Sequence, residues 1–245
     1  MEQRSLLIFT GQCLLALTLM AMTLCVTHTY KQIKLRQGAI HVKGCAEKQI
    51  QSDYVKWQCV ITAIGETQTD AYQKLERDLK VIREYLEQEG IDLNSTEFLP
   101  ISTNINYQRN DKGIILGKID TYELCQSFII GSSNVPLVTK VSQNITSLIK
   151  SGLSVNSYSP QYFYTKIDEL KINMLGEAAK DALLRAEALV SKSTSKVGAL
   201  LSAQQGIFQI TPAFSTSVSD YGEYDTSSIA KRIKAVVTME YAIDR

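Results

Sequence analysis

Residues 54–90 read YVKWQCVITAIGETQTDAYQKLERDLKVIREYLEQEG, and two apolar periods follow one another in them. The first period is two, typical of a strand with one buried face, and it is carried by Val55, Trp57, Cys59, Ile61 and Ala63. After Gly65-Glu66-Thr67 the spacing changes to three and four, as in an amphipathic helix, at Ala71, Leu75, Leu79, Ile82 and Leu86. Gly90 is suited to the C-terminus of that helix. The segment therefore predicts a strand followed by a helix.

Strands and helices alternate over the rest of the chain. We expect a strand from Ile40, a hairpin around residues 110–113, a helix over 135–148, a strand over 153–164, an Ala-rich helix over 167–193, and strands over 200–210 and 229–243. No Pro/Ser-rich hinge interrupts them. The prediction is an α+β fold: one domain over residues 38–245, with an antiparallel or mixed sheet and helices packed on one face.

Residues 5–30 carry no Asp, Glu, Lys or Arg. A segment of this length can cross a hydrocarbon core of about 30 Å as a helix. We therefore expect a transmembrane anchor in residues 1–30, with the lipid bilayer contacted by residues 6–27 and a basic linker at 31–37. A cleaved signal peptide is the alternative, although residues 24–28 offer no convincing Ala-x-Ala cleavage site. Lys31, Lys34 and Arg36 follow the span and only Arg4 precedes it, a bias that favours a cytoplasmic C-terminal domain.

The charge of the chain argues against one class of partner. Among 245 residues, 26 Lys+Arg stand against 25 Asp+Glu, which gives a formal net charge of +1. A protein that neutralises many phosphates needs a clear surplus of basic side chains. We expect no nucleic-acid partner.

Side chains for catalysis or metal binding are scarce. The only histidines are His28 and His41, too few for a multi-histidine metal site in one chain. His41 and Cys45 would share a strand face, but four residues along a strand separate them by about 13 Å, too far for a Cys-His dyad. Residues 113–119 have the wrong spacing for a phosphate-binding loop. Asp181 and Glu187 do not share a helical face. We expect no catalytic residue, no metal and no cofactor.

Two segments resemble a known family. The first is Ile40-His-Val-Lys-Gly44-Cys-Ala-Glu with the Ser52-Asp53 pair and the strand, turn and helix after it; the second is the Ala-rich run over residues 178–189 with Val197-Gly198. In order and spacing they are similar to bacterial SIMPL-domain proteins. The resemblance implies an envelope protein, membrane-anchored or periplasmic, with a role around the cell envelope and stress tolerance. Some members assemble into ring-like homo-oligomers. It also implies that the domain lies outside the bacterial cytoplasmic (inner) membrane, against the local charge bias.

The sequence also suggests particular roles for individual residues. Gly44 and Gly198 would permit tight turns, and Asp53 would satisfy nearby backbone donors. Two hydroxyl-rich stretches are candidate contact surfaces because loops often carry recognition and Tyr suits interfaces; their tyrosines are Tyr158, Tyr162, Tyr164, Tyr221 and Tyr224. The expected function is a non-enzymatic, single-pass envelope protein that forms a homo-oligomer or scaffolds an envelope protein partner. The alternative is an envelope module that binds a ligand or peptide through the Tyr/Ser-rich loops.

Overall fold

A computed structural model describes residues 15–30, 38–215 and 219–244. The chain forms two compact units. One, here the α4 unit, comprises Met1–Ala46, Lys171–Ile207 and Ala235–Arg245; the other, the α2 unit, comprises Glu47–Leu170 and Phe208–Lys234. Strands β1 (Ala39–Gln51) and β11 (Ala230–Asp244) each contribute residues to both units, so the division falls inside strands.

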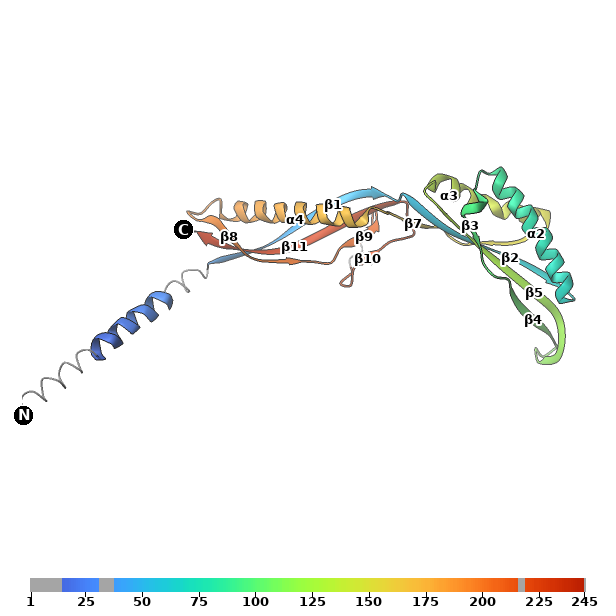
Figure 1. Cartoon of the computed structure of the whole chain (residues 1–245), viewed down its shortest axis with the longest axis horizontal. Coiled ribbons are helices and arrows are strands. Elements are labelled where there is room, and N and C mark those ends of the chain that lie inside the picture. Colours follow the sequence, from blue (N-terminus) through green and yellow to red (C-terminus); the bar gives the residue numbers. More distant parts are fainter. Residues whose placement is uncertain (1–14, 31–37, 216–218, 245) are drawn as a thin grey trace, which may run out of the picture. The chain divides into compact units, whose positions relative to one another are not determined.

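A six-stranded sheet lies in the α2 unit (Figure 1). Its strand order is β3-β5-β2-β6, β4 pairs with β5, β7 pairs with β2, and all these pairs are antiparallel. The strands are β2 (Tyr54–Gly65), β3 (Thr96–Phe98), β4 (Ser102–Arg109), β5 (Ile115–Ser132), β6 (Ser154–Ser157) and β7 (Gln161–Phe163). Strand β2 buries every second residue, as its sequence period predicts.

Helices α2 (Gln68–Gln88) and α3 (Val135–Asn144) cover one face of this sheet. Helix α2 begins where Thr67 accepts a hydrogen bond from the Asp70 amide at 3.1 Å, which caps a free N–H group. It lies so close to β2 that a β-carbon on Gly65 would come within 2.4 Å of the Ala71 nitrogen. Gly90 follows the helix with φ of 86°. The predicted arrangement of helices on one face is confirmed for this sheet.

The core of the α2 unit is centred on Trp57 and Phe128, both fully buried. Their rings meet edge to face, with centroids 5.5 Å apart. The indole nitrogen of Trp57 donates to the Ser157 hydroxyl at 3.1 Å, and that hydroxyl donates to the Ser142 carbonyl at 2.7 Å. A buried indole N–H left without a partner would cost stability, and this chain of hydrogen bonds satisfies it.

The second sheet has the order β1-β11-β9-β10, with β8 also paired to β11. Its further strands are β8 (Lys196–Gln205), β9 (Gln209–Pro212) and β10 (Glu223–Tyr224). In the α4 unit, β8 runs antiparallel to residues 237–244 of β11. Helix α4 (Ile167–Val190) contributes a fully buried stripe of small side chains there, at Ala178, Ala182 and Ala186. The predicted Ala-rich helix is thus confirmed.

Several predicted elements are interrupted. The helix expected over 135–148 ends at Asn144 and continues as the 3₁₀ helix η2 (Ile145–Ser151); a second 3₁₀ helix, η1, spans Leu93–Ser95. The strand expected over 153–164 is divided into β6 and β7. The strand expected over 200–210 is divided into β8 and β9 at Gly206, whose amide donates to the Val236 carbonyl at 2.8 Å. Between β6 and β7 stands Pro160, which lacks the backbone N–H that a continuous strand would use.

Residues 15–30 form a helix. In the parts of the chain described, none of the helices combines the length and apolar character needed to cross a membrane. Residues 1–14, which include the start of the predicted anchor, and the predicted linker at 31–37 lie outside the described residues.

Candidate functional site

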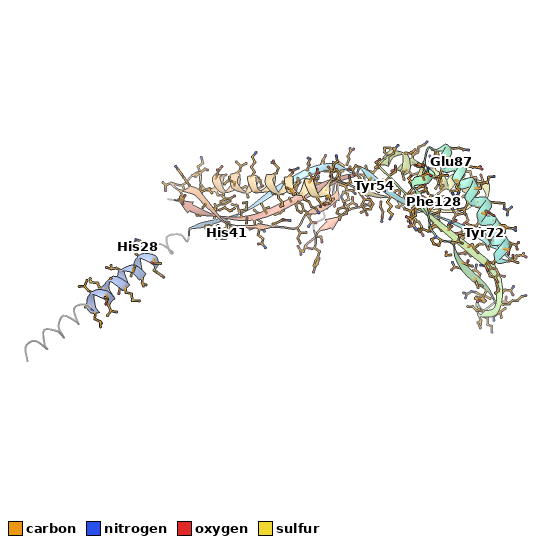
Figure 2. The ribbon with its side chains drawn as sticks, viewed as in Figure 1. His28, His41, Tyr54, Tyr72, Glu87 and Phe128 are labelled. Atoms are coloured by element: carbon orange, nitrogen blue, oxygen red, sulfur yellow. The ribbon has the colours of Figure 1, made fainter. Side chains whose placement is uncertain are left out.

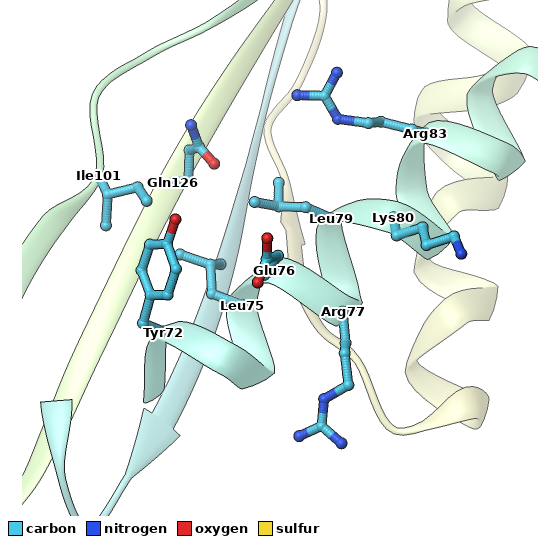
Figure 3. A pocket seen from close by; sticks show the side chains of 9 residues that line it. All are labelled: Tyr72, Leu75, Glu76, Arg77, Leu79, Lys80, Arg83, Ile101 and Gln126. Atoms are coloured by element: carbon cyan, nitrogen blue, oxygen red, sulfur yellow. The ribbon is translucent and has the colours of Figure 1, made fainter. Parts of the chain in front are cut away.

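A groove of about 620 Å³ opens on the α2 unit, between α2 and the sheet (Figure 3). Its floor is apolar, formed by the buried Leu75 and the partly buried Leu79. Ile101 and Gln126 line the sheet side. The outer side carries an aromatic ring and charged groups of both signs from α2, namely Tyr72, Glu76, Arg77, Lys80 and Arg83.

Two contacts fix the sheet side of this groove. The Gln126 amide donates to the Leu99 carbonyl at 2.8 Å, which holds the segment before Ile101 against β5. The guanidinium carbon of Arg83 lies 3.9 Å from the centre of the Phe98 ring, a cation–π contact. An apolar floor with a few polar groups around it is the usual composition of a small-molecule or peptide site.

Sequence reasoning missed this groove. The signal available was a second stripe on α2, beside the buried one, at Tyr72, Glu76, Lys80 and Arg83. Its spacing of four, four and three keeps these side chains on one helical face. The partner residues Ile101 and Gln126 come from other elements, so no local pattern points to them.

The five candidate tyrosines fall into different environments, all within the α2 unit. Tyr162 is buried, and its hydroxyl lies 3.1 Å from the Thr139 hydroxyl, so it belongs to the core rather than to a contact surface. Tyr164 is half-buried. Tyr158 and Tyr224 are about half exposed, while Tyr221 is 96% exposed. Tyr158, Tyr221 and Tyr224 are therefore exposed enough to contact a partner.

The end of the predicted Ser/Tyr-rich loop is a buried polar cluster. Asp225 and Lys231 form an ion pair at 3.1 Å, with side chains only 6% and 1% exposed. Asp225 also accepts hydrogen bonds from the amides and hydroxyls of Ser227 and Ser228. Burial raises the pKa of Asp225, but the hydrogen bonds from Ser228, Ser227 and Lys231 outweigh it and hold the pKa well below its usual range. Residues 225–231 therefore have a structural role. Residues 216–218 of the loop lie outside the described residues.

Of the three residues expected to have structural roles, the two glycines are placed differently from the prediction. Gly44 lies inside β1 and Gly198 inside β8, so neither forms a tight turn; a β-carbon on Gly44 would meet α4, and one on Gly198 would meet the Asp244 side chain. Asp53 lies between β1 and β2, where it accepts from the amide and hydroxyl of Thr165 at 2.7 and 2.9 Å.

Asp181 of α4 has a backbone partner in β1. Its carboxylate accepts from the Cys45 amide and from the Arg185 side chain, each at 2.8 Å. The Cys45 amide, together with Arg185, lowers the pKa of Asp181. The Asp181 side chain therefore links α4 to β1.

The remaining candidates for chemistry do not converge. His28 lies in the helix over residues 15–30 and His41 on β1 (Figure 2), where the His41 ring is 3.6 Å from the Glu240 carboxylate. Burial raises the pKa of the Cys59 thiol to about 12, so it is not a ready nucleophile. Within the described ranges, no three His, Cys, Asp or Glu side chains are grouped to hold a metal ion.

The fold and these surfaces define an α+β protein with two sheets and an open groove. Residues 40–241 match the family described as SIMPL, protein of unknown function (DUF541), so the chain belongs to the SIMPL family. The match covers strands of both units. A search of curated proteins found no match.

Proposed function

We propose that this chain is a non-enzymatic, single-pass protein of the bacterial cell envelope, whose SIMPL domain self-assembles or scaffolds other envelope proteins. The observation that carries the proposal is that two aromatic side chains between β9 and β10 are almost fully exposed. Phe214, after β9, is 89% exposed, and Tyr221, before β10, is 96% exposed. Aromatic residues are enriched in the cores of protein interfaces, where their large area is removed from water.

The edge strand that follows Tyr221 supports the same proposal. Strand β10 stands at the end of its sheet's order and pairs in parallel with β9. An edge strand offers unpaired backbone groups to another chain. Tyr224 of β10 adds a half-exposed ring to this surface. The three exposed aromatics on and between β9 and β10, Phe214, Tyr221 and Tyr224, are here called as a set the β10 surface.

The membrane part of the proposal rests on the uncharged residues 5–30, with bilayer contact through residues 6–27. The extracytoplasmic side and a contribution to envelope stress tolerance rest on the SIMPL resemblance, and Lys31, Lys34 and Arg36 argue for the opposite side. Fusion of a reporter enzyme that is active only outside the cytoplasm to residue 245 tests the orientation.

The assembly proposal is tested by sedimentation of the full chain in detergent. The double variant Phe214→Ser/Tyr221→Ser should lower the mass of the assembly, because it removes the apolar area of the β10 surface. Ile172→Ser is the matched control, since Ile172 is 72% exposed on α4, outside that surface. An equal effect of both variants, or of neither, would remove the β10 surface from the proposal.

A second candidate function is a binding module for a peptide or small ligand, favoured by the groove beside α2 rather than by the Tyr/Ser-rich loops. Thermal-shift screening of the full chain with short peptides tests it. A stabilising peptide should lose its effect in Tyr72→Ala/Lys80→Ala, since these side chains line the groove. Retention of the shift in that variant would place binding elsewhere.

A further inference from the structure

The end of the β4–β5 hairpin extends beyond the rest of its sheet (Figure 1). Strand β2 pairs with β5 only from Tyr122 to Ser132, whereas β4 pairs with β5 out to Arg109 and Ile115. Residues 109–118, which contain the turn, are here called the hairpin tip. They have no third strand beside them in the described chain.

The hairpin tip exposes three consecutive aliphatic side chains. Ile114, Ile115 and Leu116 are 59%, 53% and 57% exposed. Neighbouring residues of a strand point to opposite faces, so Ile115 and Leu116 present apolar groups on both sides of the hairpin. A flat protein surface would cover only one of these faces. The interior of a bilayer, in contrast, surrounds an inserted tip with apolar groups on all sides.

The backbone of the tip is hydrogen-bonded within itself. The Asn110 amide donates to the Ile114 carbonyl at 3.0 Å, and the Gly113 amide to the Asn110 carbonyl at 2.8 Å. The Asn110 side chain accepts from the amides of Lys112 and Ile114. Arg109 donates to the Gly113 carbonyl at 3.2 Å. Such internal pairing lowers the cost of moving the backbone into a medium without water.

Basic residues flank the aliphatic ones in the sequence of the tip. Arg109, Lys112 and Lys118 carry three positive charges and Asp111 carries one negative charge, so the tip has a net charge of +2. Long basic side chains can lie along apolar surface and place their charges among anionic headgroups. Behind the tip, the half-exposed Tyr107 pairs with Ile119. Tyrosine is enriched at membrane–water interfaces.

We infer that the hairpin tip is a membrane-docking element, which inserts Ile114, Ile115 and Leu116 into the interfacial region of an anionic lipid bilayer. This site is separate from the proposed anchor at residues 6–27 and adds a second lipid contact in the α2 unit. The charges at its rim make the docking stronger on anionic than on neutral lipid, and weaker in high salt.

The test places a fluorophore at the tip of the full chain. In Leu116→Trp, the introduced indole is exposed in solution, while the native Trp57 is fully buried and provides a constant background. The protein is added to vesicles of phosphatidylcholine and phosphatidylglycerol in equal parts, with bromine on the acyl chains as a quencher. Ile172→Trp is the matched control, an exposed aliphatic position on α4. Thermal melting checks that both variants keep the wild-type fold.

The expected result is a blue shift and quenching of the indole at position 116, with none at position 172. Lys112→Glu/Lys118→Glu in the Leu116→Trp background should reduce the quenching. No quenching at position 116, or equal quenching at both positions, would overturn the inference. A blue shift without lipid that grows with protein concentration would indicate that the tip contacts a second copy of the chain, and would also overturn the inference.

Co-sedimentation with vesicles reports on the anchor separately, since a chain that sediments without quenching at 116 is held by residues 6–27 alone.

Discussion

Gly44 of β1 lies directly against Ala178 of α4: a β-carbon on Gly44 would come within 2.0 Å of the Ala178 carbonyl oxygen. That β-carbon would also be 2.6 Å from the Ala182 nitrogen. Real side-chain carbons do not approach backbone atoms so closely, so even the smallest side chain at this position requires the helix to move. Glycine on the strand and alanines on the helix together set the distance between β1 and α4.

Gly44→Ala should therefore destabilise the protein by about 2–3 kcal/mol, the cost of overpacking a close contact. Gly176→Ala is the control on α4, because a β-carbon on Gly176 would meet no atom from outside its own helix within 4 Å, and alanine favours a helix by up to about 1 kcal/mol. Thermal melting followed by circular dichroism should show a lower midpoint for the first variant and an equal or higher one for the second. A midpoint for Gly44→Ala at or above wild type would contradict the contact.

The buried pair of Asp225 and Lys231 should respond unequally to the loss of each partner. Asp225→Ala leaves the Lys231 ammonium buried without its counter-charge, which costs about 3–5 kcal/mol. Lys231→Met leaves the carboxylate with its hydrogen bonds from Ser227 and Ser228, so the loss should be smaller. Chemical denaturation of both variants measures the difference. Equal losses, or a larger loss for Lys231→Met, would show that the serines do not support the carboxylate.

The depressed pKa of Asp225 also determines how the stability of the folded protein should change with pH. Its pKa in the folded protein is depressed, whereas in the unfolded chain it lies near the ordinary value of about 3.9. A depressed pKa contributes stability above about pH 4, and this stability is lost as pH falls toward the folded value. Asp181 acts in the same direction. Asp225→Asn should therefore lose less stability than wild type between neutral pH and strongly acidic pH, measured by denaturation across the range. Parallel curves for the two proteins would argue against this role.

The hydroxyl of Tyr85 on α2 is buried, and no protein group in the described chain lies within hydrogen-bonding distance. A buried polar group without a partner costs about 1–3 kcal/mol. Tyr85→Phe should thus leave the protein as stable as wild type or more stable by about 1 kcal/mol, which denaturant titration can measure. Tyr162→Phe is the control, because its hydroxyl does have a partner in Thr139 and the change should destabilise. Destabilisation by Tyr85→Phe would mean that a bound water satisfies the hydroxyl.

The fold could be predicted where a pattern is local. The alternation from Val55 to Ala63 and the period of α2 reflect which face meets the core, so the sequence alone identifies both elements. The division into two units has no comparable pattern in the sequence, because it falls inside β1 and β11 and needs no linker.

The candidate site was harder to predict because it depends on distant contacts. Tyr162 sits in a hydroxyl-rich stretch that resembles an exposed loop, yet its partner Thr139 comes from α3. Gly44 is typical of a turn in sequence, and only the position of α4 shows its packing role. The groove joins α2 to Ile101 and Gln126, which no sequence spacing connects.

Self-assembly of this SIMPL protein can be measured as the mass of the full chain in detergent, by light scattering coupled to size exclusion. We expect a discrete multiple of the 27.3 kDa chain that persists on dilution and is reduced by Phe214→Ser/Tyr221→Ser. A protein mass equal to one chain at every concentration would contradict it.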